Sequence, residues 1–145
     1  MKCLNVKLLR HNAIVPTRKT AGSVGYDVAA CLDDEVVIMP GETEIIGSGF
    51  AIALELGYAA FIYARSGLGT KHGIVPGNCV GVIDSDYRGE VLVGLRNMSS
   101  QAFTVRNGDR IAQMVISKCF LPEPVLVDDL NETLRGDGGF GSTGV

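Results

Sequence analysis

Long apolar runs, closely paired cysteines and clustered basic residues are all missing from this sequence of 145 residues. No stretch approaches the roughly 18 apolar residues that span a bilayer, and the N-terminal segment has no apolar core of signal-peptide length. We therefore expect a soluble intracellular protein, cytoplasmic unless a eukaryotic or viral source places it in the nucleus. The four cysteines, Cys3, Cys31, Cys79 and Cys119, are widely spaced without a C-x-x-C pair. This spacing argues against a zinc site or a redox motif, and we expect reduced thiols.

A broad basic surface is also absent. The formal net charge is −3 at pH 7 and the 13 Lys and Arg residues are scattered along the chain. This distribution argues against binding of nucleic acid through a large positive patch, so any anion sites must be local. The length suits one domain, and neither a linker-like run nor a fixed-period repeat divides it.

What the sequence does contain is a series of short apolar and β-branched runs, each closed by Gly, Pro, Asn or Asp. Ten of them predict strands: CLNVKLL, VGYDVAA, EVVIMP, GFAIALEL, AAFIYAR, CVGVID, EVLVGL, AFTV, RIAQMVI and PVLV. The only helical candidate is a short stretch around SGLGTKHG, beginning at Ser66, a residue type favoured at the N-cap. We expect an all-β sandwich, barrel or jelly roll over residues 1–122, followed by a C-terminal arm, residues 123–145, that packs on another subunit.

Arg65 and Ser66 mark a first candidate binding site, within ARSGLGTKHG. Arg65 ends a predicted strand, and Ser66 begins a predicted helical turn. This junction brings together a guanidinium, a hydroxyl and free backbone N–H groups, as an anion site requires. An ordinary strand-to-helix junction with a surface arginine explains the same letters equally well. His72 is more typical of a structural histidine than of a general base.

A second candidate site lies in GNCVGVIDSDYRGEV, where DSDYRGE predicts the turn of a β-hairpin with a permissive backbone at Gly89. Gly81 lacks a side chain, so a planar base can approach the backbone there. Asn78 both donates and accepts hydrogen bonds, which suits an imide edge such as that of uracil. Asp84 comes where the strand meets the turn, partly shielded, and is our candidate general base.

For two further residues of this turn, Asp86 and Tyr87, the sequence allows both a functional and a structural role. Asp86 either completes a paired carboxylate site for a metal or is a solvated turn residue, and we favour the second. Tyr87 either stacks on a sugar or merely covers the hairpin.

Two polar residues inside apolar strands also need partners. Gln113, in GDRIAQMVI, requires hydrogen bonds if it is buried, and period-two counting places it on the face opposite Arg110. Asp27, in AGSVGYDVAA, points either to a metal or to a structural arginine partner.

The final segment, RGDGGFGSTGV, is too rich in glycine to order itself. It predicts a flap that closes over a ligand carrying negative charge and a flat ring. Arg135 would supply charge, Phe140 would stack, and the glycines with Ser142 and Thr143 would bond to phosphate through backbone and hydroxyl groups.

Together these stretches resemble the homotrimeric dUTP pyrophosphatase (dUTPase) family. Its five motifs occur in order over nearly the whole chain: AGSVGYDVAA, ARSGLGTKHG, GNCVGVIDSDYRGEV, GDRIAQMVI and RGDGGFGSTG. The resemblance implies a distorted jelly roll and a homotrimer with active sites at its interfaces. It also implies a C-terminal arm exchanged between subunits, and hydrolysis of dUTP to dUMP and pyrophosphate with Mg²⁺.

The resemblance also implies a role for each residue. Asp84 would be the general base that activates water for attack on the α-phosphorus. Uracil would be bound by Asn78, Gly81, Val82 and Ile83, and Tyr87 would lie under the deoxyribose. The phosphates would be held by Arg65, Ser66, Gly67, Gln113 and Arg135, while Asp27 would organise the metal through water. In the closed tail Phe140 would stack on the base, with Gly141, Ser142 and Thr143 beside it.

Two other functions are considered beside hydrolysis of dUTP. A dCTP deaminase-like enzyme resembles this family in fold, but its own serine-arginine motif is not found here. The second alternative is a binding protein that is switched by a nucleotide. The intact Asp84 and the complete tail argue against it.

Overall fold

The computed structural model of the protein describes residues 3–139. Ten strands and one helix make up the fold. The strands are β1 (Asn5–Leu8), β2 (Gly25–Ala29), β3 (Val36–Ile38), β4 (Thr43–Ala53), β5 (Tyr58–Tyr63), β6 (Ile74–Pro76), β7 (Gly81–Ile83), β8 (Glu90–Asn97), β9 (Phe103–Val105) and β10 (Arg110–Lys118). The helix is α1 (Ser66–His72).

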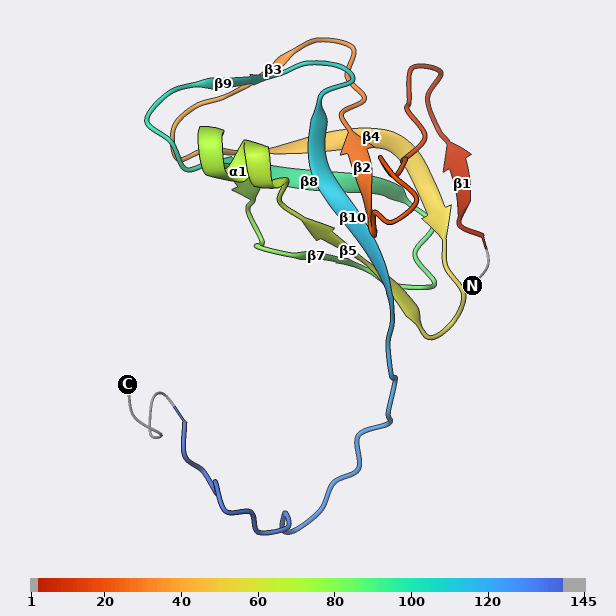
Figure 1. The fold of residues 1–145 in the computed structure, drawn as a ribbon, viewed down its shortest axis with the longest axis vertical. Coiled ribbons are helices and arrows are strands. Elements are labelled where there is room, and N and C mark those ends of the chain that lie inside the picture. Colours follow the sequence, from red (N-terminus) through yellow and green to blue (C-terminus); the bar gives the residue numbers. More distant parts are fainter. Residues whose placement is uncertain (1–2, 140–145) are drawn as a thin grey trace.

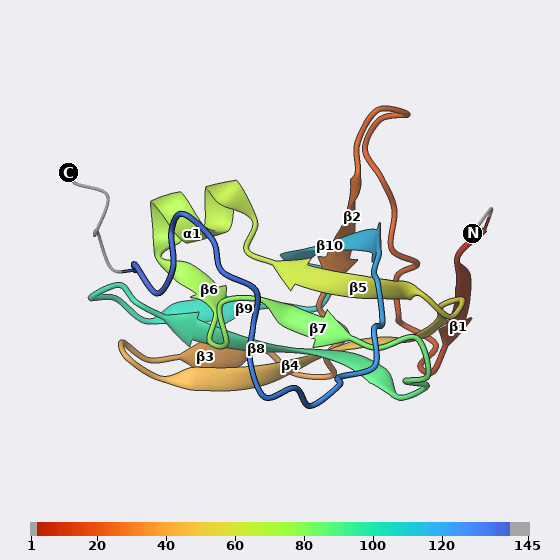
Figure 2. The ribbon, with the colours of Figure 1, turned by 90° about the horizontal axis from the view of Figure 1, so that it is seen from below.

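The strands form two four-stranded sheets and a two-stranded ribbon. One sheet has the order β1-β4-β8-β6, the second β2-β10-β5-β7, and the ribbon pairs β3 with β9; all pairs are antiparallel. Figure 2 shows the second sheet lying over the first, with α1 at one end. This arrangement is a jelly-roll type of β fold, as the sequence predicts.

The core lies between the two sheets. Its largest fully buried side chains are Phe50, Ile38, Ile46, Ile74, Leu95, Ile111 and Met114. They come from both sheets and, in the case of Ile38, from the ribbon, because alternate residues of a strand point to opposite faces. Each contributes roughly 1.5–3 kcal/mol by leaving water, which makes this layer the main source of stability.

Nine of the ten predicted strands are present, and the differences have physical causes. The run PVLV, residues 124–127, forms no strand, because the chain offers it no neighbour with which to pair. β6 was not predicted, since its three residues are enclosed by Gly73 and Gly77 and contain a proline. The helix begins at Ser66 as expected, but its N-cap is Arg65, with no side-chain cap.

The segment after β10 leaves the body of the molecule (Figure 1). Residues 120–137 are all exposed, and Leu126 is 98% exposed. The four cysteines are free, and among the described residues no helix is long and apolar enough to cross a membrane.

Candidate active site

Three neighbouring strands of the second sheet bring polar residues into one row. Gln113 of β10 is paired with Asp27 of β2 on one side and with Tyr63 of β5 on the other. Directly opposed residues of antiparallel strands share a face of the sheet. The first and fourth candidate motifs therefore meet on the outer face of this sheet.

Asp27 lies between two arginines. Its Oδ1 is 3.2 Å from Nε of Arg65, and its Oδ2 accepts a hydrogen bond from Nη1 of Arg110 at 3.0 Å. Nη1 of Arg65 also donates to the carbonyl oxygen of Arg110 at 3.0 Å. The side chain of Asp27 is only 12% exposed, against 24% for Arg65 and 44% for Arg110. The carboxylate thus holds two guanidinium groups side by side at the surface, where an anion can reach them.

The period-two expectation that Arg110 and Gln113 face opposite ways is wrong. The register of β10 against β2 shifts between Arg110 and Ala112, and the two residues between Arg110 and Gln113 are both buried. An irregularity of this kind re-aims the side chains that precede it. Both polar side chains therefore reach the outer face, where Asp27 contacts one and is paired with the other.

Gln113 is exposed, so its amide does not need the partners that burial would require. Its side chain packs against the backbone of Gly25. A Cβ at Gly25 would lie 2.9 Å from Cδ of Gln113, closer than side chains tolerate. The glycine therefore makes room for the amide.

Ser66 and Gly67 begin α1 immediately after Arg65, and both are exposed. No acidic residue lies in the first turn of the helix. The nearby carboxylate of Asp27 is already paired with its arginines, so it does not oppose an anion at this end of the helix. His72 packs against Phe103, with 5.6 Å between ring centroids, as expected of a structural residue.

Asp84 follows β7 at the start of a turn, in which the N–H of Tyr87 donates to its carbonyl at 3.2 Å. The predicted hairpin is wrong: β7 pairs with β5, and β8 pairs with β4 and β6, so the turn links two sheets. Asp84 is exposed rather than partly shielded. Gly89 does not have a positive φ; it accommodates the ring of Tyr87, whose Cζ would lie 2.6 Å from a Cβ there.

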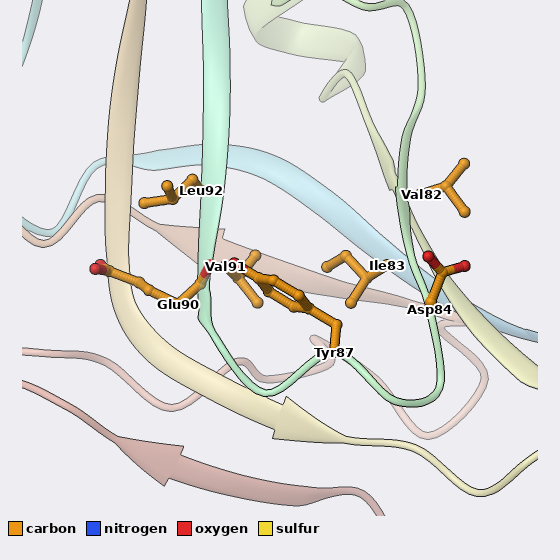
Figure 3. A pocket seen from close by; sticks show the side chains of 7 residues that line it. All are labelled: Val82, Ile83, Asp84, Tyr87, Glu90, Val91 and Leu92. Carbon is orange, nitrogen blue, oxygen red and sulfur yellow. Dashed lines mark hydrogen bonds between the residues drawn. The ribbon is translucent and has the colours of Figure 1, made fainter.

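A hollow of about 200 Å³ lies beside this turn. It is lined by Val82, Ile83, Asp84, Tyr87, Glu90, Val91 and Leu92. In Figure 3 the ring of Tyr87 extends from the turn toward the start of β8, and Ile83 points toward Val91 while Val82 points away from it. Asn78 and Gly81 lie just before, and Cys79 between them has a φ of +65°.

Within one chain, the carboxylate of Asp84 is far from the arginine cluster. On β5 the row of Asp27 continues at Tyr63, whose neighbour Ile62 is paired with Gly81 of β7. The row therefore passes one residue before Gly81, and thus four residues before Asp84. From β2 to β7 the sheet is crossed by three strand spacings, and Asp84 lies a further four residues along the strand direction. Combined, these two displacements separate the Cα atoms of Asp27 and Asp84 by about 20 Å. The two parts of the predicted site are thus not brought together by folding alone.

The remaining predicted residues belong to the C-terminal segment. Arg135 is exposed, and its Nε donates to the carbonyl oxygen of Gly138 at 2.8 Å, within its own turn. Phe140, Gly141, Ser142 and Thr143 lie outside the described residues.

The donor set does not form a protein cage for a metal. No group of three or more His, Cys, Asp or Glu side chains among residues 3–139 is placed to hold an ion. The contacts of Asp27 with two arginines leave it suited to a water-mediated contact rather than direct ligation. Mg²⁺ is typically held by few carboxylates together with substrate phosphates and water, and the site is compatible with that mode.

Sequence reasoning missed Glu90, which lines the hollow. Glu90 is the last residue of DSDYRGE, where a glutamate is typical of a solvated turn. No neighbouring residue in the sequence indicates that its side chain has a structural partner. Arg110 was assigned away from the site, because the irregularity in β10 has no signature in the letters.

Comparison with known proteins places these features in one family. The dUTPase family model matches residues 11–144. The deoxyuridine 5'-triphosphate nucleotidohydrolase of Neisseria meningitidis is 53% identical over 133 residues, covering 91% of this chain and 89% of the relative. That of Shigella flexneri is 46% identical, covering 99% of both. The dUTPase of Staphylococcus bacteriophage 80alpha, solved with dUpNHpp, superposes with a TM-score of 0.91 at 28% identity over the whole of both chains. The chain therefore belongs to the dUTPase family.

Proposed function

We propose that the protein hydrolyses dUTP to dUMP and pyrophosphate, as a dUTP diphosphatase. The observation that carries the proposal is the placement of an exposed carboxylate, Asp84, at the rim of a hollow beside an edge strand, in a chain of this family. The relatives are named as nucleotidohydrolases of deoxyuridine triphosphate, and the phage structure contains dUpNHpp. In the cell this reaction keeps uracil out of DNA and supplies dUMP for thymidylate synthesis.

Uracil pairs with the backbone of β7. This strand is at the edge of its sheet, with β5 as its one neighbour, so its outer N–H and C=O groups are open to a planar base. Gly81 contributes its backbone, since a Cβ there would lie 3.1 Å from Cβ of Ile62 in β5, and the amide of Asn78 completes the contacts with the imide edge. Val82 and Ile83 continue the strand, and a 5-methyl group would clash there, which excludes thymine.

Tyr87 lies against the deoxyribose and leaves no room for a 2′-hydroxyl. Its phenol is held by a hydrogen bond to the carbonyl oxygen of Glu90 at 3.1 Å. A ring fixed at one end makes a firm wall, which is what exclusion of a single oxygen atom requires.

Asp84 removes a proton from the water that attacks the α-phosphorus. The carboxylate is exposed, so water reaches it directly. A positioned base of this type contributes roughly 10²- to 10⁴-fold to the rate.

The phosphates are bound by the arginine cluster and the start of α1. Arg65 is oriented by Asp27 before substrate arrives, so little order is lost when it binds a phosphate. Ser66, Gly67 and Gln113 offer hydroxyl, backbone and amide donors beside it. Mg²⁺, when bound, neutralises phosphate charge. It would be held by the phosphates and by water that Asp27 orders.

The active form is a homotrimer with shared sites. The separation of about 20 Å between Asp27 and Asp84 within one chain supports this arrangement, in which a second copy brings the base to the phosphates. The C-terminal arm, residues 123–145, supplies a third contribution. Its Val125 and Leu126 are 80% and 98% exposed in a single chain, so they need cover from a neighbour.

The end of the arm closes the site. Arg135 reaches the γ-phosphate and Phe140 stacks over the base, with Gly141, Ser142 and Thr143 against the phosphates. Closure excludes bulk water and fixes the geometry of attack.

The test is release of pyrophosphate from dUTP, compared with dTTP, dCTP and UTP, by the parent and by Asp84→Asn. We expect turnover of dUTP alone, and a variant that still binds dUTP with kcat reduced by about 10²- to 10⁴-fold, because only the base is lost. Ammonia from dCTP would favour a deaminase, and binding of dUTP without turnover by the parent would favour a nucleotide-switched binding protein. An Asp84→Asn variant as fast as the parent would refute the assignment of the base.

A further inference from the structure

The phenol of Tyr87 depends on the backbone of β8. Its hydroxyl donates to the carbonyl oxygen of Glu90, and its own N–H donates to the carbonyl of Asp84. Gly89 leaves the space that the ring fills. The backbone bond holds the turn, and the bond of the hydroxyl holds the far end of the ring, so the position of the ring depends on where the carbonyl of Glu90 lies.

Opposite Glu90, β4 departs from regular pairing. The register passes from Gly47 opposite Leu92 to Ala51 opposite Glu90, so β4 has extra residues at this point. Such an irregularity deprives backbone groups of their ladder partners. The N–H of Gly49 instead donates to Oε1 of Glu90 at 2.6 Å. The carboxylate thus takes the place of a missing strand carbonyl, with the added strength of a charged acceptor.

The irregularity is a fixed part of the fold, and glycines make room for the carboxylate. A Cβ on Gly47 would lie 2.6 Å from Oε1 of Glu90. Gly49 has a φ of +72°, which favours glycine, and its carbonyl accepts from the N–H of Leu9 at 2.8 Å. In Figure 3 the carboxylate of Glu90 points toward β4 and away from Tyr87. It therefore faces its backbone partner rather than the hollow.

We propose that Glu90 is a positioning residue for Tyr87 and, through it, a determinant of selectivity for the sugar. The side chain fixes the first residue of β8 against β4, and the carbonyl of that same residue fixes the phenol. Without the carboxylate, the start of β8 loses its bond to Gly49, and the carbonyl that holds the phenol of Tyr87 is no longer fixed. The ring then gains freedom to move and excludes a 2′-hydroxyl less strictly. This inference rests on the proposed function, in which Tyr87 contacts the deoxyribose.

The experiment measures kcat and KM for dUTP and UTP in Glu90→Ala, Glu90→Gln, Tyr87→Phe and the double variant Glu90→Ala/Tyr87→Phe. We expect Glu90→Ala to lower the dUTP-to-UTP ratio of kcat/KM about tenfold, with a raised KM for dUTP and kcat changed less. Glu90→Gln restores most of the ratio, because its amide oxygen still accepts from Gly49. Tyr87→Phe lowers the ratio to a similar degree, and the double variant is no less selective than either single one. Glu44→Ala, at an exposed position of β4, is the matched control.

An unchanged ratio in a folded Glu90→Ala variant would overturn the proposal, and so would additive losses in the double variant or a Glu90→Gln variant as unselective as Glu90→Ala. If Glu90→Ala does not fold, Tyr87→Phe decides: it keeps the ring but lacks the bond to Glu90, so an unchanged ratio refutes the link. Failure of the parent to release pyrophosphate from dUTP would instead refute the proposed function.

Discussion

At the scale of single residues, the candidate site depends on contacts between segments that are far apart in the sequence. Arg65 and Asp84 could be proposed from the sequence, because each charged residue follows an apolar run that predicts a strand, so its position at the end of that strand is known. The partnership of Asp27 with Arg65 and Arg110 could only be left as one of two alternatives, since those partners are far away in the sequence. Glu90 was missed for the same reason, because its acceptor role depends on Gly49.

Gly25 provides a test of the phosphate site at this scale. Gly25→Ala places a Cβ against Cδ of Gln113, so the amide must move away from the row that it shares with Asp27. We expect KM for dUTP to rise about fivefold, while kcat and the melting temperature change little. Gly22→Ala is the matched control, because a Cβ there meets nothing within 4 Å. Equal kinetics of the two variants would contradict a binding role for Gln113.

At the scale of secondary-structure elements, strands were predictable and their pairing was not. Short apolar runs located nine of the ten predicted strands. The hairpin of β7 and β8 was inferred from their proximity in the sequence, but β7 pairs with β5, and β8 pairs with β4 and β6. Period-two counting failed at Arg110 because the register of β10 shifts beside it. These outcomes depend on contacts between distant segments, which local letters do not encode.

Asn97, at the end of β8, shows how elements are joined. It is fully buried, and its Nδ2 donates to the carbonyls of Ile38 at 2.9 Å and Gln101 at 2.7 Å, while its Oδ1 accepts from the N–H of Ser99 at 2.9 Å. Asn97→Ala leaves these groups without partners. We expect a loss of about 2–3 kcal/mol in the free energy of unfolding, measured with urea. Ser100→Ala, at an exposed neighbour, serves as the control, and a loss no larger than that of the control would contradict this role.

At the scale of the whole molecule, the exposed C-terminal segment and the separation of Asp27 from Asp84 both support the proposal that the functional unit contains more than one chain. The sequence predicted an arm from the change in composition after residue 122. The strand expected at residues 124–127 is not formed, and these residues are exposed.

Removal of residues 135–145 separates closure from assembly. We expect the truncated protein to keep its oligomeric state, measured by light scattering, because the apolar Val125 and Leu126 remain. Turnover of dUTP should fall by at least about 10²-fold, since Arg135 and the closing flap are lost. Unchanged turnover would refute the flap, and dissociation of the oligomer would show that this segment serves assembly.

The most direct test of the whole account mixes two variants, Asp84→Asn and Arg65→Ala, each expected to be nearly inactive. The variants are unfolded, combined in equal amounts and refolded together, and hydrolysis of dUTP is measured. If the base and the phosphate site of each centre come from different chains, random mixing restores about a quarter of parental turnover, because about one pairing in four has both native residues. A refolded mixture as inactive as either variant alone would contradict a site shared between subunits.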